Sequence, residues 1–296
     1  MAFLIHQWGN YFHLPLTLSG FSFGTSLIPD ILHPRRLFLV CPCCPGSNHF
    51  VLDSNILDLG PIEQANIRYC SLARVVSPNL TSLGFSGDVK YLEDVLSQIE
   101  TPMLIQSDFW FFNRLVFDTP LLGHFIRRTE TFMTIYRARI HFFSWAVKVK
   151  LSGQEETANN GREALQLKIS CKLLDWQLSA VAQILNPFLS SFSALEILEI
   201  AISPEDWQGK IEVTQWREFL RPFTSVKEMS LKFKDSVWVI APALQELAEE
   251  TTEVLPALQN LVLWMYPWQP SGPVKEAIDQ FVATQQLYGH PVTIHY

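Results

Sequence analysis

A cluster of cysteines with one histidine, Cys41-Pro-Cys43-Cys44-Pro-Gly-Ser-Asn-His49, contains the residue types best suited to chemistry in this sequence. Thiolates and an imidazole can hold zinc in a tetrahedral site. Such a site is usually built from spaced ligand pairs, whereas Cys43 and Cys44 are adjacent and no second pair follows. We therefore favour free thiols over a zinc site. The odd total of five cysteines, which includes Cys70 and Cys171, favours a reducing compartment over a disulfide framework.

The segment Gly84-Phe-Ser86-Gly-Asp88 comes close to the G-x-S-x-G pattern of a hydrolase nucleophile, but its fifth residue is Asp88. A strand end followed by a helix cap explains it better. The sequence contains no glycine-rich phosphate loop, no H-E-x-x-H and no Walker motif. His124, His141 and His290 stand singly in apolar surroundings, which is typical of structural histidines. We therefore expect no enzyme, no cofactor and no metal.

The composition predicts a folded chain and excludes several kinds of partner. Hydrophobic residues make up 48% of the 296 residues and charged residues 17%, with a net charge of −7. No run of Lys and Arg exceeds two residues, so we expect no nucleic-acid binding. No apolar stretch approaches the roughly 18 residues of a membrane span, so we expect no membrane insertion. Residues 1–24 lack the basic start of a secretory signal, and we expect an intracellular protein, cytoplasmic or nuclear.

A short apolar phrase recurs along the chain, with apolar residues at its positions 1, 4 and 6. Its copies are Leu80-Thr-Ser-Leu83-Gly-Phe85, Leu195-Glu-Ile-Leu198-Glu-Ile200, Val226-Lys-Glu-Met229-Ser-Leu231 and Leu258-Gln-Asn-Leu261-Val-Leu263. The last three copies begin 31 and 32 residues apart (195 to 226 and 226 to 258). A fixed period of this size indicates a repeat architecture, and L-x-x-L-x-L is the pattern of a leucine-rich repeat strand.

Helical patterns alternate with these strands. Asp88 is a plausible N-cap for the first helix, Pro242 can start another, and Pro273 falls in the first turn of the last. This alternation predicts an α/β fold in which a mostly parallel sheet curves into a leucine-rich-repeat-like solenoid with outer helices. An ordinary open α/β domain is the alternative. Residues 132–152 alternate with period two and predict an antiparallel, β-hairpin-type insertion.

Further phrases carry a family resemblance. They are Tyr91-Leu-Glu-Asp94, Phe111-Phe-Asn-Arg-Leu-Val-Phe-Asp-Thr-Pro120, Ile169-Ser-Cys171, Asp175-Trp-Gln-Leu178, Thr214-Gln-Trp216, Pro222-Phe-Thr-Ser-Val-Lys227, Ala241-Pro-Ala-Leu-Gln-Glu-Leu247, Thr252-Glu-Val-Leu-Pro-Ala-Leu-Gln-Asn260, Gln269-Pro-Ser-Gly-Pro273 and Gly289-His-Pro-Val292. With these phrases, residues 66–296 resemble the fungal F-box proteins with irregular leucine-rich repeats. The phrases belong to a scaffold and carry no chemistry.

The resemblance implies a substrate receptor of a cullin-RING ubiquitin ligase. In that family an N-terminal F-box docks on the ligase adaptor, and the repeats hold the protein to be ubiquitinated. Here Leu27-Ile-Pro-Asp-Ile-Leu32 is the nearest match to an F-box opening, but His33-Pro34 follows it and would break the first helix. We therefore divide the chain into an irregular segment, 1–66, and a repeat domain, 67–296. The segment is a divergent or truncated F-box region or extra repeats, with residues 35–40 as a candidate strand. The alternative function is a repeat protein that binds a partner without ligase coupling.

The candidate binding residues are those at positions 3, 5 and 7 of the repeat phrases. If positions 1, 4 and 6 point to the core, these residues point onto the concave face of the sheet. In the last two copies they are Glu228, Ser230, Lys232, Asn260, Val262 and Trp264. Trp264 stands out, because an exposed aromatic side chain is typical of a binding anchor. The alternative is that the insertion or a loop covers it.

Overall fold

The structure of the protein is a computed structural model. The structure describes residues 49–53, 75–112, 117–153, 163–171, 173–189, 194–203, 212–249, 254–264 and 270–296. The chain divides into two compact units, Met1–Pro34 and Arg35–Tyr296, and all the described residues belong to the second. Of the segment expected to be irregular, only His49–Asp53 is described, and it forms a strand.

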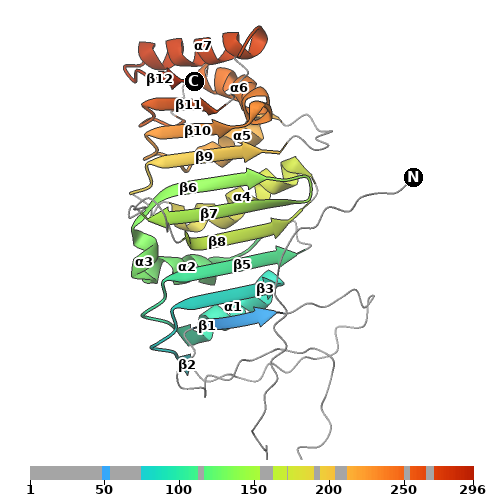
Figure 1. The fold of residues 1–296 in the computed structure, drawn as a ribbon, viewed down its shortest axis with the longest axis vertical. Helices are drawn as coiled ribbons and strands as arrows, with labels where there is room; N and C mark the ends of the chain where they lie inside the picture. The colour runs from blue at the N-terminus through green and yellow to red at the C-terminus, as the bar shows by residue number, and fades with distance from the viewer. Residues whose placement is uncertain are drawn as a thin grey trace, which may run out of the picture. The chain divides into compact units, whose positions relative to one another are not determined.

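The second unit is built on one large mixed sheet, which Figure 1 shows face on. Its ten described strands, in spatial order, are β1 (His49–Asp53), β3 (Ser82–Gly87), β5 (Gln106–Phe112), β8 (Glu163–Ser170), β7 (Ala146–Gly153), β6 (Ile135–Phe142), β9 (Ile197–Ile202), β10 (Glu228–Lys232), β11 (Asn260–Trp264) and β12 (Thr293–His295). All neighbours pair in parallel except at β7, which is antiparallel to both β6 and β8. A separate two-stranded sheet pairs β2 (Val75–Val76) with β4 (Ile99–Glu100).

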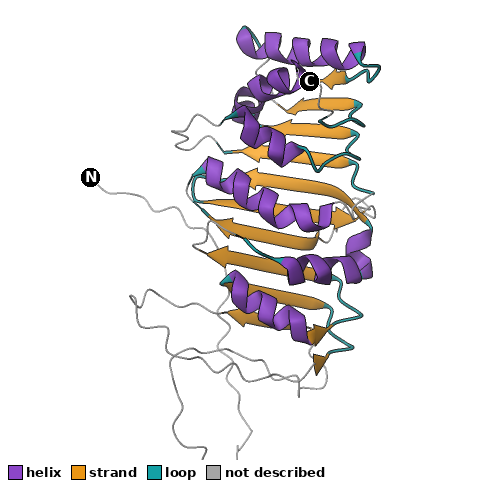
Figure 2. Ribbon diagram, turned by 180° about the vertical axis from the view of Figure 1, so that it is seen from behind, coloured by secondary structure: helices purple, strands orange, loops and turns teal. Residues whose placement is uncertain are grey.

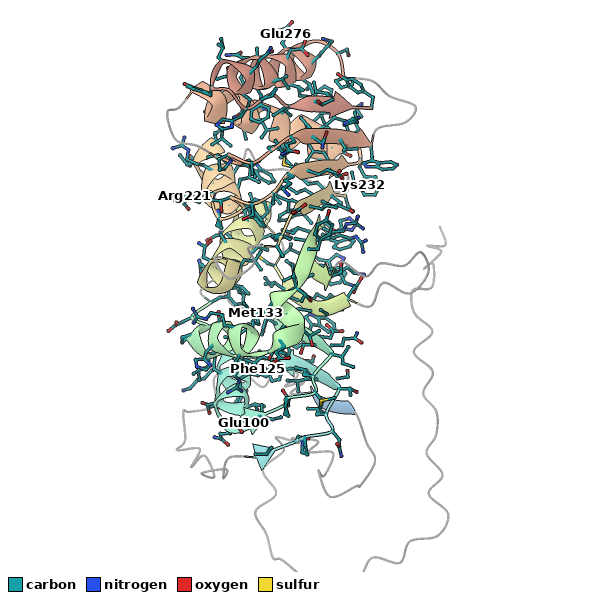
Figure 3. The ribbon with its side chains drawn as sticks, turned by 90° about the vertical axis from the view of Figure 1, so that its left-hand side faces the viewer. Glu100, Phe125, Met133, Arg221, Lys232 and Glu276 are labelled. Atoms are coloured by element: carbon teal, nitrogen blue, oxygen red, sulfur yellow. The ribbon has the colours of Figure 1, made fainter. Side chains whose placement is uncertain are left out.

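The helices gather on one face of this sheet (Figure 2). They are α1 (Val89–Gln98), α2 (Pro120–Arg128), α3 (Glu130–Met133), α4 (Leu174–Leu189), α5 (Val213–Leu220), α6 (Lys234–Glu249) and α7 (Pro273–Leu287). We call the opposite side of the sheet the open face. In the side view, Lys232 lies on the open face and Arg221 lies on the side of the helices (Figure 3). No described helix has the length and apolarity that crossing a membrane requires.

The repeat phrases form the strands that the sequence predicts. The strands that follow positions 80, 195, 226 and 258 are β3, β9, β10 and β11, and all four lie in one sheet. Leu198, Leu231 and Leu261 are each 0% exposed, which confirms the predicted inward register. The residue at position 1, such as Leu258, lies in the turn before its strand and is also buried. Each phrase therefore contributes one buried residue from the turn and two from the strand.

The antiparallel prediction for 132–152 is also confirmed, because β6 and β7 form a hairpin. The hairpin is built into the middle of the sheet rather than placed outside it. β5 pairs with β8 and β6 pairs with β9, so the chain passes through α2 and α3 to reach β6 and through α4 to reach β9. Side chains of α5 pack beneath the hairpin, with the rings of Trp216 and Phe219 within 6.2 and 6.0 Å of the ring of Phe142.

One expected helix start is wrong. Helix α6 begins at Lys234, and Pro242 lies inside it rather than at its first turn. A proline inside a helix removes one backbone hydrogen bond and usually kinks or breaks the helix. Pro242 is exposed, so the carbonyl group that loses its partner can bind water. Ser236 secures the start of the helix, because its buried hydroxyl accepts a hydrogen bond of 2.8 Å from the backbone N–H of Ile202.

Candidate protein-binding surface

The six predicted binding residues lie together on the open face, in two adjacent parallel strands. Glu228 pairs with Asn260, Ser230 with Val262, and Lys232 with Trp264. Residues 32 positions apart in the sequence are thus direct neighbours, as the repeat period predicts. Ser230 departs from the expectation of an accessible site, because it is only 2% exposed and its hydroxyl has no hydrogen-bond partner among the described residues.

Trp264 is the most exposed of the tryptophans that the structure describes. Its side chain is 58% exposed, so neither the hairpin nor any other described segment covers it. The Nζ atom of Lys232 lies 3.8 Å from the centroid of the indole ring, within the range of a cation–π contact. Burial lowers the pKa of Lys232, and the nearby carboxylate of Glu199 opposes this effect. The ammonium group of Lys232 thus packs on the indole ring of Trp264, and the rest of the ring is open to a partner.

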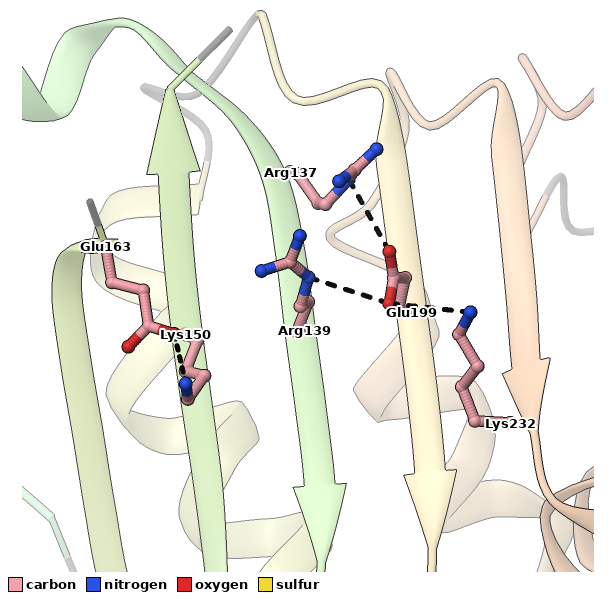
Figure 4. A network of polar contacts seen from close by, with 6 residues as sticks. All are labelled: Arg137, Arg139, Lys150, Glu163, Glu199 and Lys232. Atoms are coloured by element: carbon pink, nitrogen blue, oxygen red, sulfur yellow. Dashed lines mark hydrogen bonds and ion pairs between the residues drawn. The ribbon is translucent and has the colours of Figure 1, made fainter. Parts of the chain in front are cut away.

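An ion-pair network lies next to this pair, around the carboxylate of Glu199 on β9 (Figure 4). The Nε atoms of Arg137 and Arg139 lie 3.5 and 3.6 Å from its two oxygens, and Nζ of Lys232 lies 4.0 Å away. Parallel pairing of β6 with β9 places Arg139 directly beside Glu199. The carboxylate of Glu199 on β9 therefore lies among three cations that come from its two neighbouring strands, β6 and β10.

Two further lysines extend the charge toward β8. Lys148 on β7 pairs directly with Lys168 on β8, so both side chains emerge side by side on the open face. Nζ of Lys168 lies 3.7 Å from the ring centroid of Trp110 and 4.5 Å from that of Trp145. Lys148 forms no hydrogen bond or ion pair with any described residue, whereas its neighbour Lys150 pairs with Glu163.

The pKa values of these two lysines are lowered for the same physical reasons. Burial is the main cause that lowers the pKa of Lys148, and the charge of Lys150 lowers it further. Burial also lowers the pKa of Lys168, and the charge of Lys148 adds to that effect. Asp108 opposes both shifts but lies beyond ion-pair distance of either ammonium group. The surface thus holds two partly buried lysines, Lys148 and Lys168, that form no ion pair with any described carboxylate.

His141 lies in the same row of the open face, on β6. Its Nε2 atom is 2.8 Å from the hydroxyl oxygen of Ser203, and its ring stacks on Phe143 at 3.9 Å between centroids. Burial, together with the charge of Lys148, lowers the pKa of His141, so the neutral ring is favoured, and its Nε2 atom can accept a hydrogen bond from the Ser203 hydroxyl. A serine with a histidine resembles part of a catalytic triad, but no described carboxylate contacts the other ring nitrogen. The contact orients the ring.

These groups surround a shallow hollow of about 430 Å³ on the open face. It is lined by Arg139, Ile140, His141, Lys148, Lys150, Glu199, Ala201, Lys232, Phe233 and Trp264. Four of these residues are cationic and one is anionic, which leaves a formal charge of 4 − 1 = +3 with His141 neutral. The hollow is therefore strongly positive, although the whole chain carries a charge of −7.

The other residues considered from the sequence lie elsewhere. Gly84 and Ser86 belong to β3, and Asp88 caps α1 by accepting a hydrogen bond from the backbone N–H of Lys90 at 2.9 Å, which confirms the strand-and-cap interpretation. His124 is exposed on α2. Cysteines 41, 43, 44 and 70 lie outside the described residues. Within the described ranges, no three His, Cys, Asp or Glu side chains are placed to hold a metal.

Sequence reasoning missed most of the positive surface. The signal was present, because the polar members of the alternating pattern in β6 and β7 are Arg137, Arg139, Lys148 and Lys150. The pattern predicts strands, but it does not show that these side chains share one face with Lys232. For the same reason His141 stands out in the sequence only as a single histidine.

No protein-family model, no curated protein and no solved structure matches this chain.

Proposed function

We propose that this chain is a non-catalytic protein-binding protein and that the open face of its sheet holds the partner. The observation that carries the proposal is the exposed Trp264, flanked by Lys232 and by a positive hollow on a face that no described helix covers. Binding energy in protein interfaces is concentrated in a few aromatic and Arg anchors surrounded by a polar rim. Trp264 has the character of such an anchor.

The finer architecture that we propose is a leucine-rich-repeat-like solenoid. Three consecutive units, each a strand followed by a helix, place β9, β10 and β11 in parallel register. Equivalent residues Leu198, Met229 and Leu261 align across these strands and are fully buried, as in a stack of repeats. Such a sheet curves, and its helix-free side becomes the concave binding surface.

Within this class, the resemblance supports the substrate-recognition part of an F-box subunit of a cullin-RING ubiquitin ligase. Its partners would be a protein to be ubiquitinated and the ligase adaptor. The candidate F-box opening, 27–32, lies outside the described residues. The alternative is a repeat protein that binds its partner without ligase coupling.

The full chain, immobilised and exposed to native cell extract, tests the binding function, with Trp264→Ala in parallel. We expect a protein that the wild-type chain retains and the variant loses. A separate pull-down with purified ligase adaptor distinguishes the two versions of the proposal. Retention of the adaptor supports the F-box subunit, and its absence supports binding without ligase coupling. Equal capture by both chains would contradict the open-face assignment.

A further inference from the structure

The open face carries a local excess of positive charge in an acidic chain. We call six side chains on neighbouring strands the cationic patch: Arg137, Arg139, Lys148, Lys150, Lys168 and Lys232. Among the described residues of the strands from β5 to β10, the carboxylates on the same face are Asp108, Glu163, Glu199 and Glu228, so the local balance there is 6 − 4 = +2. The excess is greatest in the hollow, where only Glu199 opposes four cations.

Lys148 is a cation of the patch that lies beside other cations. It is partly buried between Lys150 on its own strand and Lys168 opposite, and no described carboxylate is within ion-pair distance. Like charges placed directly opposite each other destabilise a sheet. A buried charge without a partner is also costly. A carboxylate from a partner would offset both effects.

Aromatic side chains mark both ends of the cationic patch. Trp110 and Trp145, which is 49% exposed, flank Lys168 at one end, and Trp264 covers Lys232 at the other. Trp145 immediately precedes β7 and Trp264 lies on β11, and the order β7-β6-β9-β10-β11 makes four steps across the sheet. At about 4.8 Å a step, these two tryptophans are about 19 Å apart across the sheet. An extended peptide of about six or seven residues spans that distance.

We propose that the open face binds an extended acidic peptide segment of a protein partner, with its carboxylates on the cationic patch and an apolar residue at each end against Trp264 and Trp145. This proposal rests on the protein-binding function above and adds the chemistry of the partner. Cations interleaved with aromatic rings also bind single-stranded nucleic acid. The position of Glu199 in the hollow favours a peptide, because the carboxylates of a peptide lie on side chains that can turn away from Glu199, whereas the phosphates of a nucleic acid are fixed in its backbone.

The test uses the full chain and a dye-labelled heptapeptide that has Phe at both ends and Glu in between, with binding followed by fluorescence anisotropy. Two comparison probes are the same peptide with Gln in place of Glu and a single-stranded oligothymidylate of similar length. The variants are Lys148→Gln in the cationic patch and, as a matched loss of one positive charge, Lys275→Gln on α7. Circular dichroism melting of each variant confirms that it is folded.

We expect the Glu peptide to bind, the Gln peptide to bind at least about tenfold more weakly, and Lys148→Gln to weaken the Glu peptide by about tenfold. Lys275→Gln should bind like the wild type, and added salt should weaken the complex. Equal binding of the Glu and Gln peptides would overturn the acidic specificity. Tighter binding of oligothymidylate would overturn it in favour of nucleic acid. If no peptide binds but capture from extract still depends on Trp264, the acidic partner is wrong while the protein-binding function stands.

Discussion

Lys148 and Lys168 lie directly opposite each other in the antiparallel pair of β7 and β8, and neither has a described carboxylate within ion-pair distance. The strands hold this unfavourable pair because their other faces supply the stability. Val147, Val149 and Leu167 are each at most 1% exposed beneath it. The fold therefore tolerates a repulsive arrangement at the surface where the binding proposal requires positive charge.

The first prediction concerns the stability of this pair. Lys148→Gln should raise the free energy of unfolding by about 0.2–1 kcal/mol, because it removes a like-charge contact and a partly buried charge. Chemical denaturation measures the change. Lys150→Gln is the matched control, since it removes the partner of Glu163 and should give no gain. A loss of stability in Lys148→Gln would show that Lys148 supports the fold instead.

The repeat register predicts a large difference between two adjacent residues of β11. Leu261→Ala should cost about 2–5 kcal/mol, because the side chain is fully buried and its removal leaves a cavity. Val262→Ala, one position along on the open face, should cost less than about 1 kcal/mol. Both values come from denaturant unfolding curves. Similar costs for the two variants would contradict the assignment of faces.

Glu93 on α1 supplies the N-terminal cap that α2 lacks locally. Its carboxylate oxygens accept hydrogen bonds of 2.8 Å from the backbone N–H groups of Leu121 and Leu122, while Thr119 makes no side-chain cap bond. Glu93→Ala should therefore cost about 1–2 kcal/mol in denaturant unfolding. The exposed Glu246→Ala on α6 is the charge-matched control and should be near neutral. Equal effects would exclude the capping role.

The same carboxylate predicts a pH dependence. Burial raises the pKa of Glu93 above its ordinary value of 4.5, and the two backbone hydrogen bonds offset this only in part. The folded state therefore holds the proton more tightly than the unfolded state. The resulting stabilisation is complete below pH 4.5 and is lost as the pH rises through the folded pKa. As the pH rises through this window, the free energy of unfolding of the wild type should fall relative to that of Glu93→Gln. If the free energies of unfolding of the two proteins depend on pH in the same way, the raised pKa is contradicted.

The sequence was most informative where local pattern and short connections determine the structure. The phrases around Leu198, Leu231 and Leu261 fix which side chains face inward, and a strand followed by one helix brings the next strand alongside. Those residues, and the adjacency of Lys232 and Trp264, were predicted for this reason. The predicted start of α6 is wrong, because proline is common in the first turn of a helix, whereas Pro242 lies inside this helix.

The centre of the surface could not be predicted in the same way. β6, β7 and β8 follow one another in the sequence, but whether β8 pairs with β5 and β6 with β9 depends on how α2 and α4 pack across the sheet, and no local pattern specifies that. Strand order, in turn, decides that Lys148 meets Lys168 and that Arg139 meets Glu199. The alternation shows that these residues are polar and point outward. Which residues lie beside them on the neighbouring strands depends on the strand order, which the alternation does not specify.

The most direct test of the open-face binding surface compares two exposed tryptophans on opposite sides of the sheet. Trp264 on β11 is 58% exposed, and Trp238 on α6 is 50% exposed with Lys234 near its ring. Partner capture from native extract and the melting temperature are measured for Trp264→Ala, Trp238→Ala and Glu228→Lys. We predict near-normal melting for all three, with capture lost in Trp264→Ala and retained in Trp238→Ala, and with capture strengthened in Glu228→Lys because an added cation on the open face attracts an acidic partner. Unchanged capture by Trp264→Ala, or unfolding of that variant, would contradict the assignment of Trp264 as the binding anchor.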